Sequence, residues 1–304
     1  LETDQPLLNW LQENFTTPCN RAEIQALLQQ SALNLYDEAM LACAVRRLRK
    51  QVMVKLILRD LNGLADLSEV MQAMTALAEI CVQQAQACLM QTLQAQFGTP
   101  LGETSAMPQK LLIIGMGKLG GGELNVSSDI DLIFVYPEDG ETDGPRKLSN
   151  HEFFTRLGRR LINIINEPTA DGYVFRVDMR LRPSGDSGPL VTSFAALEEY
   201  LISQGREWER YAWIKARVIA PADSPQITEL MRLAQPFVFR KYLDFGAIDS
   251  MRKLHAQIRQ EVQRLDRLNN IKLGPGGIRE IEFTAQVFQL IRGGRDAALR
   301  IRPT

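Results

Sequence analysis

Three aspartates in the middle of the chain have the residue type and the spacing to bind divalent cations. Asp129 and Asp131 stand two positions apart at the start of an apolar run, so on a strand both carboxylates face the same side. Asp178, in a later segment, supplies a third carboxylate. Carboxylates held this close repel each other unless cations neutralise them, and Mg²⁺ prefers a few carboxylates together with phosphate oxygens. We therefore predict that Asp129, Asp131 and Asp178 hold two Mg²⁺ ions and catalyse an in-line displacement at phosphorus.

A glycine-rich turn precedes this aspartate pair. Gly115 and Gly117 follow a short apolar run, and glycines at these positions let the backbone approach a phosphate closely. The short helix expected next directs its first amides at that phosphate, and Lys118 adds a positive charge. Ser128, directly before Asp129, belongs to the same predicted nucleotide- and phosphate-binding set.

Arginines surround the third aspartate. Arg176, Arg180 and Arg182 alternate with apolar residues around Asp178, on the polar side of the segment. We predict that these three side chains neutralise charge on a nucleotide or on an attacking phosphate.

The same glycines formally match a dinucleotide-binding fingerprint. Gly115-x-Gly117-x-x-Gly120 follows a predicted strand, and Glu138 lies where a ribose ligand is expected. Only nine residues separate Gly120 from Ile130, however, which leaves room for about two helical turns. A full crossover helix does not fit there, so the dinucleotide interpretation is disfavoured.

Structural explanations compete with each functional one. An isolated Asp-x-Asp is usually a solvated turn, and Asp178 alone would more often pair with a neighbouring arginine. The combination with the glycine turn favours a site. His151 and His255, the two histidines, are expected at the surface or in caps, so a histidine base is not predicted. Glu207, Glu209 and Lys215 either approach the site or form a charged helix face, and the charged face is favoured.

The elements around the site predict an α+β fold that is mainly helical. Asp66 and Glu69 have the spacing of a capping box before one long amphipathic helix, and a second helix is expected from Tyr36 to Leu61. Apolar runs at 110–114 and 130–136 predict strands, and 150–166 has helical spacing. The alternation from Tyr173 to Leu181 predicts another strand, followed by a Ser/Gly loop and then helices from Ala195 to the end.

These patterns divide the chain into three regions. We predict an N-terminal helical region at 1–104, a catalytic core with a small mixed sheet at 105–220, and a C-terminal helical region at 221–304. The chain starts without methionine and ends just after an arginine-rich stretch, so we expect a piece of a longer protein.

The amino-acid composition argues against some classes of binding partner and some cellular locations. Lys+Arg 35 against Asp+Glu 36 gives a net charge of −1, which argues against general nucleic-acid binding. The sequence has neither a stretch apolar enough for a membrane helix nor a secretory leader at its start, so a cytoplasmic location is expected. The four cysteines, Cys19, Cys43, Cys81 and Cys88, lack zinc-type spacing and are predicted to be reduced, buried thiols.

The segments that carry the chemistry resemble a known family. GMGKLGGGELNVSSDIDLIFVY at 115–136, RVDMRLRPSG at 176–185, SGPLVTS at 187–193, WERYAWIKAR at 208–217 and GGIREIEF at 276–283 are similar to the polymerase-β-like nucleotidyltransferase core of the glutamine synthetase adenylyltransferase family. The resemblance covers roughly residues 105 to 304. The superfamily motif has Gly-Ser where this chain has Gly117-Lys118, so the donor that replaces the serine hydroxyl is open.

The resemblance implies a reaction and partners. Family members carry one domain that removes AMP from a tyrosine of glutamine synthetase and another that attaches it. The residue sequence from Trp208 to Arg217 resembles that of the removing domain, as does the Arg279-Glu280 pair after the Gly-Gly turn. Its reaction is phosphorolysis, in which phosphate attacks tyrosyl-AMP and ADP leaves. Adenylylated glutamine synthetase, a PII-type signal protein and the second nucleotidyltransferase domain are the implied partners.

Two alternatives stay open. The chain could instead attach AMP from ATP to the same substrate. It could also be a regulatory module whose nucleotidyltransferase fold only binds PII-type proteins or glutamine.

Overall fold

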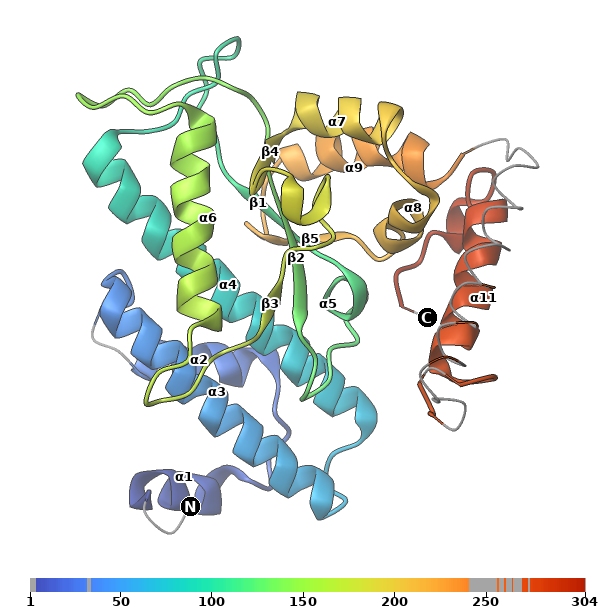
Figure 1. The fold of residues 1–304 in the computed structure, drawn as a ribbon. Helices are drawn as coiled ribbons and strands as arrows, with labels where there is room; N and C mark the ends of the chain where they lie inside the picture. The colour runs from blue at the N-terminus through green and yellow to red at the C-terminus, as the bar shows by residue number, and fades with distance from the viewer. Residues whose placement is uncertain are drawn as a thin grey trace. The chain divides into compact units, whose positions relative to one another are not determined.

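The computed structural model describes residues 4–31, 34–240, 256, 260, 264, 270–272 and 274–303, and its elements are labelled in Figure 1. The α-helices and 3₁₀ helices are α1 (Gln5–Asn14), α2 (Arg21–Ser31), α3 (Glu38–Leu61), α4 (Leu67–Phe97), α5 (Gly117–Gly121), α6 (Asn150–Asn166), η1 (Gly185–Ser187), α7 (Phe194–Ser203), α8 (Glu207–Trp213), α9 (Gln226–Val238), α11 (Ile278–Arg292) and η2 (Ala297–Leu299). The strands are β1 (Leu112–Gly115), β2 (Ile130–Tyr136), β3 (Val177–Asp178), β4 (Val191–Ser193) and β5 (Arg217–Ala220). The predicted α+β class, mainly helical with a small mixed sheet, is confirmed.

The chain forms two compact units. The first comprises Leu1–Ser193 and Arg217–Ser224, and the second comprises Phe194–Ala216 and Pro225–Thr304. The N-terminal helices and the whole sheet belong to the first unit. The predicted three-region division stays a prediction.

The N-terminal helices begin where capping residues allow. The Asp66 carboxylate accepts a hydrogen bond from the Glu69 backbone N–H at 2.7 Å, as predicted, and starts α4. The Glu69 side chain does not close a capping box. It pairs instead with Arg59 at 2.7 Å and accepts from the Cys19 N–H, because the buried Arg59 guanidinium at the end of α3 needs a counter-charge.

The sheet of the first unit is mixed. Its order is β3-β2-β1-β5, and β4 also pairs with β2. β1 runs antiparallel to β2 and to β5, whereas β3 and β4 run parallel to β2. β2 is therefore the central strand, which pairs with β3 at its start and with β4 at its end.

Two helices pack on this sheet. Figure 1 shows α4 and α6 side by side, and both contact strands of the sheet. Met74, Leu77, Cys81 and Cys88 form an apolar stripe on α4 and are fully buried in the core. Polar side chains of α4 fix the sheet edge as well, because the Gln83 amide donates to the Ile219 carbonyl at 2.6 Å. The strand predicted at 130–136 and the helix predicted at 150–166 have the expected bounds.

The strand predicted from Tyr173 to Leu181 is wrong in its length. Only Val177 and Asp178 pair with the sheet, and Val174, which alternates with Arg176 and Asp178 in the sequence, is fully buried. The reason is that the Val174 and Phe175 N–H groups donate to the Ile165 carbonyl at the end of α6, while the chain turns directly after Met179.

Two further strands were not predicted. β4 lies in the segment expected to be only a Ser/Gly loop, and β5 interrupts the region expected to be helical from Ala195. Both strands are short and are paired by the sheet, so their sequence periodicity is too brief to indicate them. Much of the remaining expected helix, at 241–269, lies outside the described residues.

The second unit contains α7, α8, α9 and α11. α7 packs on α9, and Gly205 lies against the Phe237 ring, where a Cβ would come within 2.5 Å. α8 contacts α11 through stacked Tyr211 and Phe283 rings, whose centroids are 5.1 Å apart.

Single residues test several predictions. Cys19, Cys81 and Cys88 are buried free thiols, but Cys43 is exposed, which corrects the prediction for that position because it lies on the outer side of α3. His151 is exposed in the first turn of α6, and His255 lies outside the described residues. Among the helices that the structure describes, none has the length and apolar character to span a membrane.

The pair of Arg59 and Glu69 predicts a stability effect. We expect Glu69→Ala to lower the free energy of unfolding by about 3 kcal/mol, because it leaves a buried guanidinium without a counter-charge. Urea denaturation measures this. Glu141→Ala, which removes a solvent-exposed pair with Lys147, is the matched control and should change stability by less than about 1 kcal/mol. Equal effects of the two variants would refute the assignment.

Candidate active site

Strand register brings the predicted acids together. In the parallel pair of β2 and β3, Asp131 and Asp178 are Cα partners, so both occupy the same position on neighbouring strands. Asp129 lies one residue before β2, beside Arg176, whose carbonyl accepts the Ile130 N–H at 2.9 Å. Asp129 is about half exposed, whereas the Asp178 side chain is only 17% exposed. The three aspartates therefore line one end of the sheet.

The glycine turn contacts this acidic group. The Met116 N–H donates to the Asp131 carbonyl at 2.9 Å, which brings the turn after β1 against β2. Gly117 has a φ of +51°, and a Cβ there would lie 3.2 Å from Asp131 Oδ2. Gly117 is thus needed both for its backbone conformation and for the space beside a carboxylate. Lys118 follows it in α5, partly exposed.

Gly115 serves a different purpose from the one predicted. It is buried at the end of β1, and a Cβ there would come within 2.9 Å of the Leu119 side chain and 3.0 Å of Ile219. Gly115 therefore allows α5 to pack closely on the strands. The structure gives it no exposed backbone for approach to a phosphate.

An arginine that the sequence analysis did not select holds α5 in place. Arg217, the first residue of β5, donates to the carbonyls of Leu119 and Gly120 at 2.9 Å each. Its guanidinium also pairs with the buried carboxylate of Glu79 on α4 at 2.6 Å. These contacts fix the turn that carries Gly117. No pattern in the sequence indicates them, because they join residues about 100 positions apart.

Two of the three aspartates form ion pairs with arginines. Arg176 Nε lies 2.5 Å from Asp129 Oδ1. The Arg180 guanidinium binds both oxygens of Asp178, and this pairing lowers the pKa of Asp178 against the opposing effect of burial. The charge of Asp131 is among the causes that raise the pKa of Arg180. Two of the predicted metal-binding carboxylates therefore have arginine partners, and the predicted contact of these arginines with a phosphate stays a prediction.

Two other predicted phosphate-binding residues have local partners. Arg182 Nη1 donates to the Met179 carbonyl at 2.9 Å and lies 3.4 Å from Asp186, which stabilises the turn after β3. The Ser128 hydroxyl donates to Asn125 Oδ1 at 2.6 Å and shapes the turn before Asp129. Both side chains support the loops that present the acids.

The donor set suits a hard divalent cation in its chemistry and backbone placement. Asp131 and Asp178 are adjacent carboxylates, and Asp129 follows the same end of the sheet. As the side chains stand, no group of three or more His, Cys, Asp or Glu residues is arranged around a metal position in the described part of the chain. In this arrangement Arg176 pairs with Asp129, and Arg180 pairs with Asp178.

The dinucleotide alternative is excluded by topology. That fold requires parallel strands joined by a full helix, whereas β1 and β2 are antiparallel and α5 has five residues. Glu138, the candidate ribose ligand, binds a backbone turn instead. Its carboxylate accepts hydrogen bonds from the Thr104 and Ser105 N–H groups, and the Ser105 hydroxyl is the largest cause of its lowered pKa.

The charged residues of α8 and its end have partners in the second unit. Glu207 pairs with Arg210 at 2.6 Å, and Glu209 accepts the Tyr200 hydroxyl at 2.6 Å. Lys215 lies 3.0 Å from Glu282. Glu209 and Lys215 are buried, so a solvated charged face is wrong for these two positions, because each charge has an internal partner.

Comparison with known proteins gives two family matches. A family model described as glutamate-ammonia ligase adenylyltransferase matches residues 1–232. A second model, described as GlnD PII-uridylyltransferase, matches residues 252–302.

Curated relatives agree with the first match. The chain is 61% identical over 97% of its length to a protein of Chromobacterium violaceum, and 56% identical over its full length to one of Nitrosomonas eutropha. It is 63% identical over 88% of its length to a protein of Aromatoleum aromaticum. All three are named bifunctional glutamine synthetase adenylyltransferase/adenylyl-removing enzyme. The chain spans 32%, 33% and 28% of their respective lengths.

The position of Gly117 predicts a selective effect on cation binding. Gly117→Ala and Gly122→Ala place a Cβ at φ values of +51° and +75°, so each should cost about 1 kcal/mol of stability. Only at Gly117 does the methyl meet the Asp131 carboxylate. We expect divalent cations to raise the thermal unfolding midpoint of the wild type and of Gly122→Ala, but not of Gly117→Ala. The same cation response in both variants would contradict the proposed position.

Proposed function

The chain belongs to the glutamate-ammonia ligase adenylyltransferase family, and we propose that it removes AMP from adenylylated glutamine synthetase by phosphorolysis. In this reaction a phosphate oxygen attacks the phosphorus of tyrosyl-AMP, the bond from phosphorus to the tyrosine oxygen breaks, and ADP and free tyrosine form. The observation that carries the proposal is the pairing of Asp131 with Asp178 beside Gly117.

The chemistry makes modest demands on acid and base groups. Phosphate is already an anionic nucleophile, and the leaving phenolate has a conjugate acid pKa of about 10, so it requires less protonation than an alkoxide. No histidine lies in the group of aspartates, arginines and glycines described above. The main requirement on the site is therefore to stabilise the negative charge of the phosphate groups in the transition state.

The residues divide this work. Asp129, Asp131 and Asp178 would hold Mg²⁺, two ions in our proposal, and the bound metal would offset charge on the transferred phosphoryl group. Lys118 and Arg180 would contact phosphate oxygens. Arg176 and Arg180 are mobile candidates for this role because their side chains are 64% and 75% exposed. Arg182 holds the turn through Met179, so we assign it a supporting role.

The direction of the reaction rests on resemblance. The segment from Trp208 to Arg217 and the Arg279-Glu280 pair favour removal, while the relatives carry both activities in their name. Attachment of AMP from ATP and a purely regulatory role are the outcomes that an assay must separate.

Further partners belong to the same proposal. The match of residues 252–302 to the PII-uridylyltransferase model supports a PII-type signal protein as regulator. The relatives' bifunctional name and greater length support a second nucleotidyltransferase domain in the full protein.

Direct assay tests the reaction and the metal residues. The chain, incubated with adenylylated glutamine synthetase, phosphate and Mg²⁺, should release ADP and unmodified tyrosine. Asp131→Asn and Asp129→Ala should lower the rate at least about 1,000-fold, equivalent to about 4 kcal/mol of transition-state stabilisation, with unchanged circular dichroism. Asp171→Asn, an exposed aspartate in a separate turn, is the control.

Two results of this assay would oppose the proposal. Formation of tyrosyl-AMP from ATP and unmodified glutamine synthetase, without phosphate-dependent removal, would favour attachment. Absence of Mg²⁺-dependent turnover in both directions would favour a regulatory module.

Arg180 provides a second test. We expect Arg180→Gln to raise the KM for phosphate about tenfold, because one charge-assisted contact to phosphate is lost. The variant should also bind Mg²⁺ more tightly, since Asp178 loses its competing partner. Arg159→Gln, at an exposed position of α6, is the matched control. An unchanged KM together with unchanged Mg²⁺ affinity would remove Arg180 from the site.

A further inference from the structure

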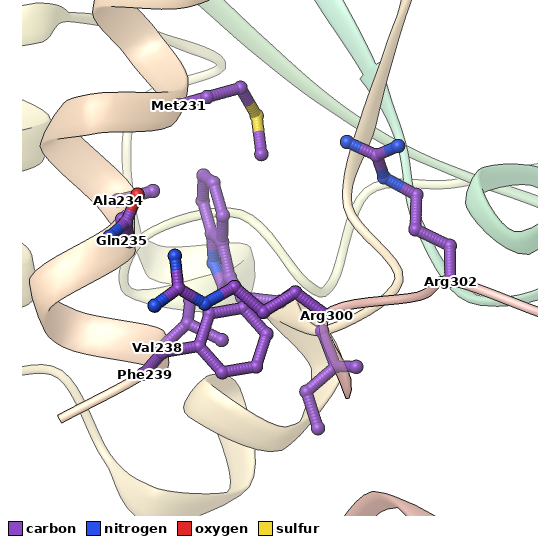
Figure 2. A pocket seen from close by; sticks show the side chains of 9 residues that line it. Met231, Ala234, Gln235, Val238, Phe239, Arg300 and Arg302 are labelled. Atoms are coloured by element: carbon purple, nitrogen blue, oxygen red, sulfur yellow. The ribbon is translucent and has the colours of Figure 1, made fainter. Parts of the chain in front are cut away.

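The second unit contains a cavity of about 140 Å³ that the proposed reaction does not use. Figure 2 shows it between α9 and the segment that carries Arg300 and Arg302. The lining residues are Trp213, Ile214, Met231, Ala234, Gln235, Val238, Phe239, Arg300 and Arg302.

The cavity has an apolar wall. Trp213, Ala234 and Val238 are buried, and Met231 projects toward the cavity from α9. A protein cavity of about 150 Å³ lined by apolar side chains holds a benzene molecule, so this volume suits a single ring or a short branched chain. Methionine in such a wall adapts its shape to the ligand.

The other wall is cationic. Arg300 Nε donates to the Gly293 carbonyl at 2.6 Å, and its guanidinium carbon lies 5.5 Å from the centroid of the Phe239 ring. Arg302 Nε donates to the Ala216 carbonyl at 2.9 Å. In both cases the backbone carbonyl takes the Nε donor and fixes the plane of the guanidinium.

The described residues that line the cavity include no acidic side chain. Among the residues that the structure describes, no carboxylate forms an ion pair with Arg300. The Phe239 ring offers only its π-face, a weaker partner for the cation. A planar guanidinium with its orientation already fixed binds carboxylate or phosphate oxygens at little cost in conformational entropy.

We propose that this cavity binds a small organic anion, in which a carboxylate or phosphate meets Arg300 and an apolar body lies against Trp213 and Met231. The site lies wholly within the second unit and is independent of the aspartates. It accepts ligands by size and charge, so a ring-sized acid fits, whereas a nucleotide exceeds the volume.

Binding of simple probes tests the proposal on the complete 304-residue chain. Benzoate and phenyl phosphate supply the two anionic groups, benzyl alcohol supplies the ring without charge, and inorganic phosphate supplies charge without the ring. Methyl-¹³C methionine NMR, with the Met231 signal assigned from Met231→Leu, follows occupancy. We expect the dissociation constant of benzoate or phenyl phosphate, measured from the shift of the Met231 signal, to be at least about tenfold lower than that of benzyl alcohol or inorganic phosphate.

Variants locate the binding. Arg300→Gln should weaken benzoate binding about tenfold, and Arg292→Gln, an exposed arginine at the end of α11, should leave it unchanged. Ala234→Leu, which adds side-chain volume to the cavity from α9 and leaves Arg300 unchanged, keeps the test valid if Arg300→Gln fails to fold. Equal affinity for benzoate and benzyl alcohol, binding that survives Ala234→Leu, or no binding up to about 10 mM would overturn the proposal.

Discussion

The parallel pairing of Ile130 and Asp131 with Val177 and Asp178 is the interaction on which the candidate site depends. Two ladder positions are a small contact, and the end of α6 reinforces them. The Asn166 side chain accepts the Val177 N–H at 3.0 Å, so β3 is held in register from outside the sheet. A slip of one residue would move the Asp178 carboxylate to the other face, away from Asp131.

Helix α4 has a matching role for the rest of the sheet. Its apolar stripe fills the core, and polar side chains at the edge of that stripe bind backbone groups that the strands leave unpaired. Gln83 reaches Ile219 at the end of β5, and Glu79 neutralises Arg217, which in turn holds α5. The glycine turn is therefore positioned from α4 and β5, through the ion pair of the buried Glu79 carboxylate with the partly exposed Arg217 guanidinium.

Arginine partners offset the negative charge of two of the three aspartates. Arg176 and Arg180 give Asp129 and Asp178 partners in the described structure, and both arginine side chains are largely exposed. The pair of Arg176 with Asp129 is exposed on both sides and contributes little to stability, so Arg176 can exchange the carboxylate for an anionic phosphate at small cost. In our proposal, the aspartates would hold the divalent cation, which would offset their negative charge, and the arginines would bind phosphate oxygens. The same side chains would then serve the free and the occupied site.

The sequence by itself determined the elements whose signal is local. The apolar run of β2, the helical period of α6 and the Asp66 cap each depend on neighbouring residues, and the structure has them as predicted. The acids and the glycine turn were also selected from spacing alone. Tertiary structure decided what lies between distant segments: the short strands β4 and β5, the Arg217 contacts, and the end of β3 after two residues. These depend on pairing partners far along the chain, and a strand of two to four residues is too short to have a period that the sequence could show.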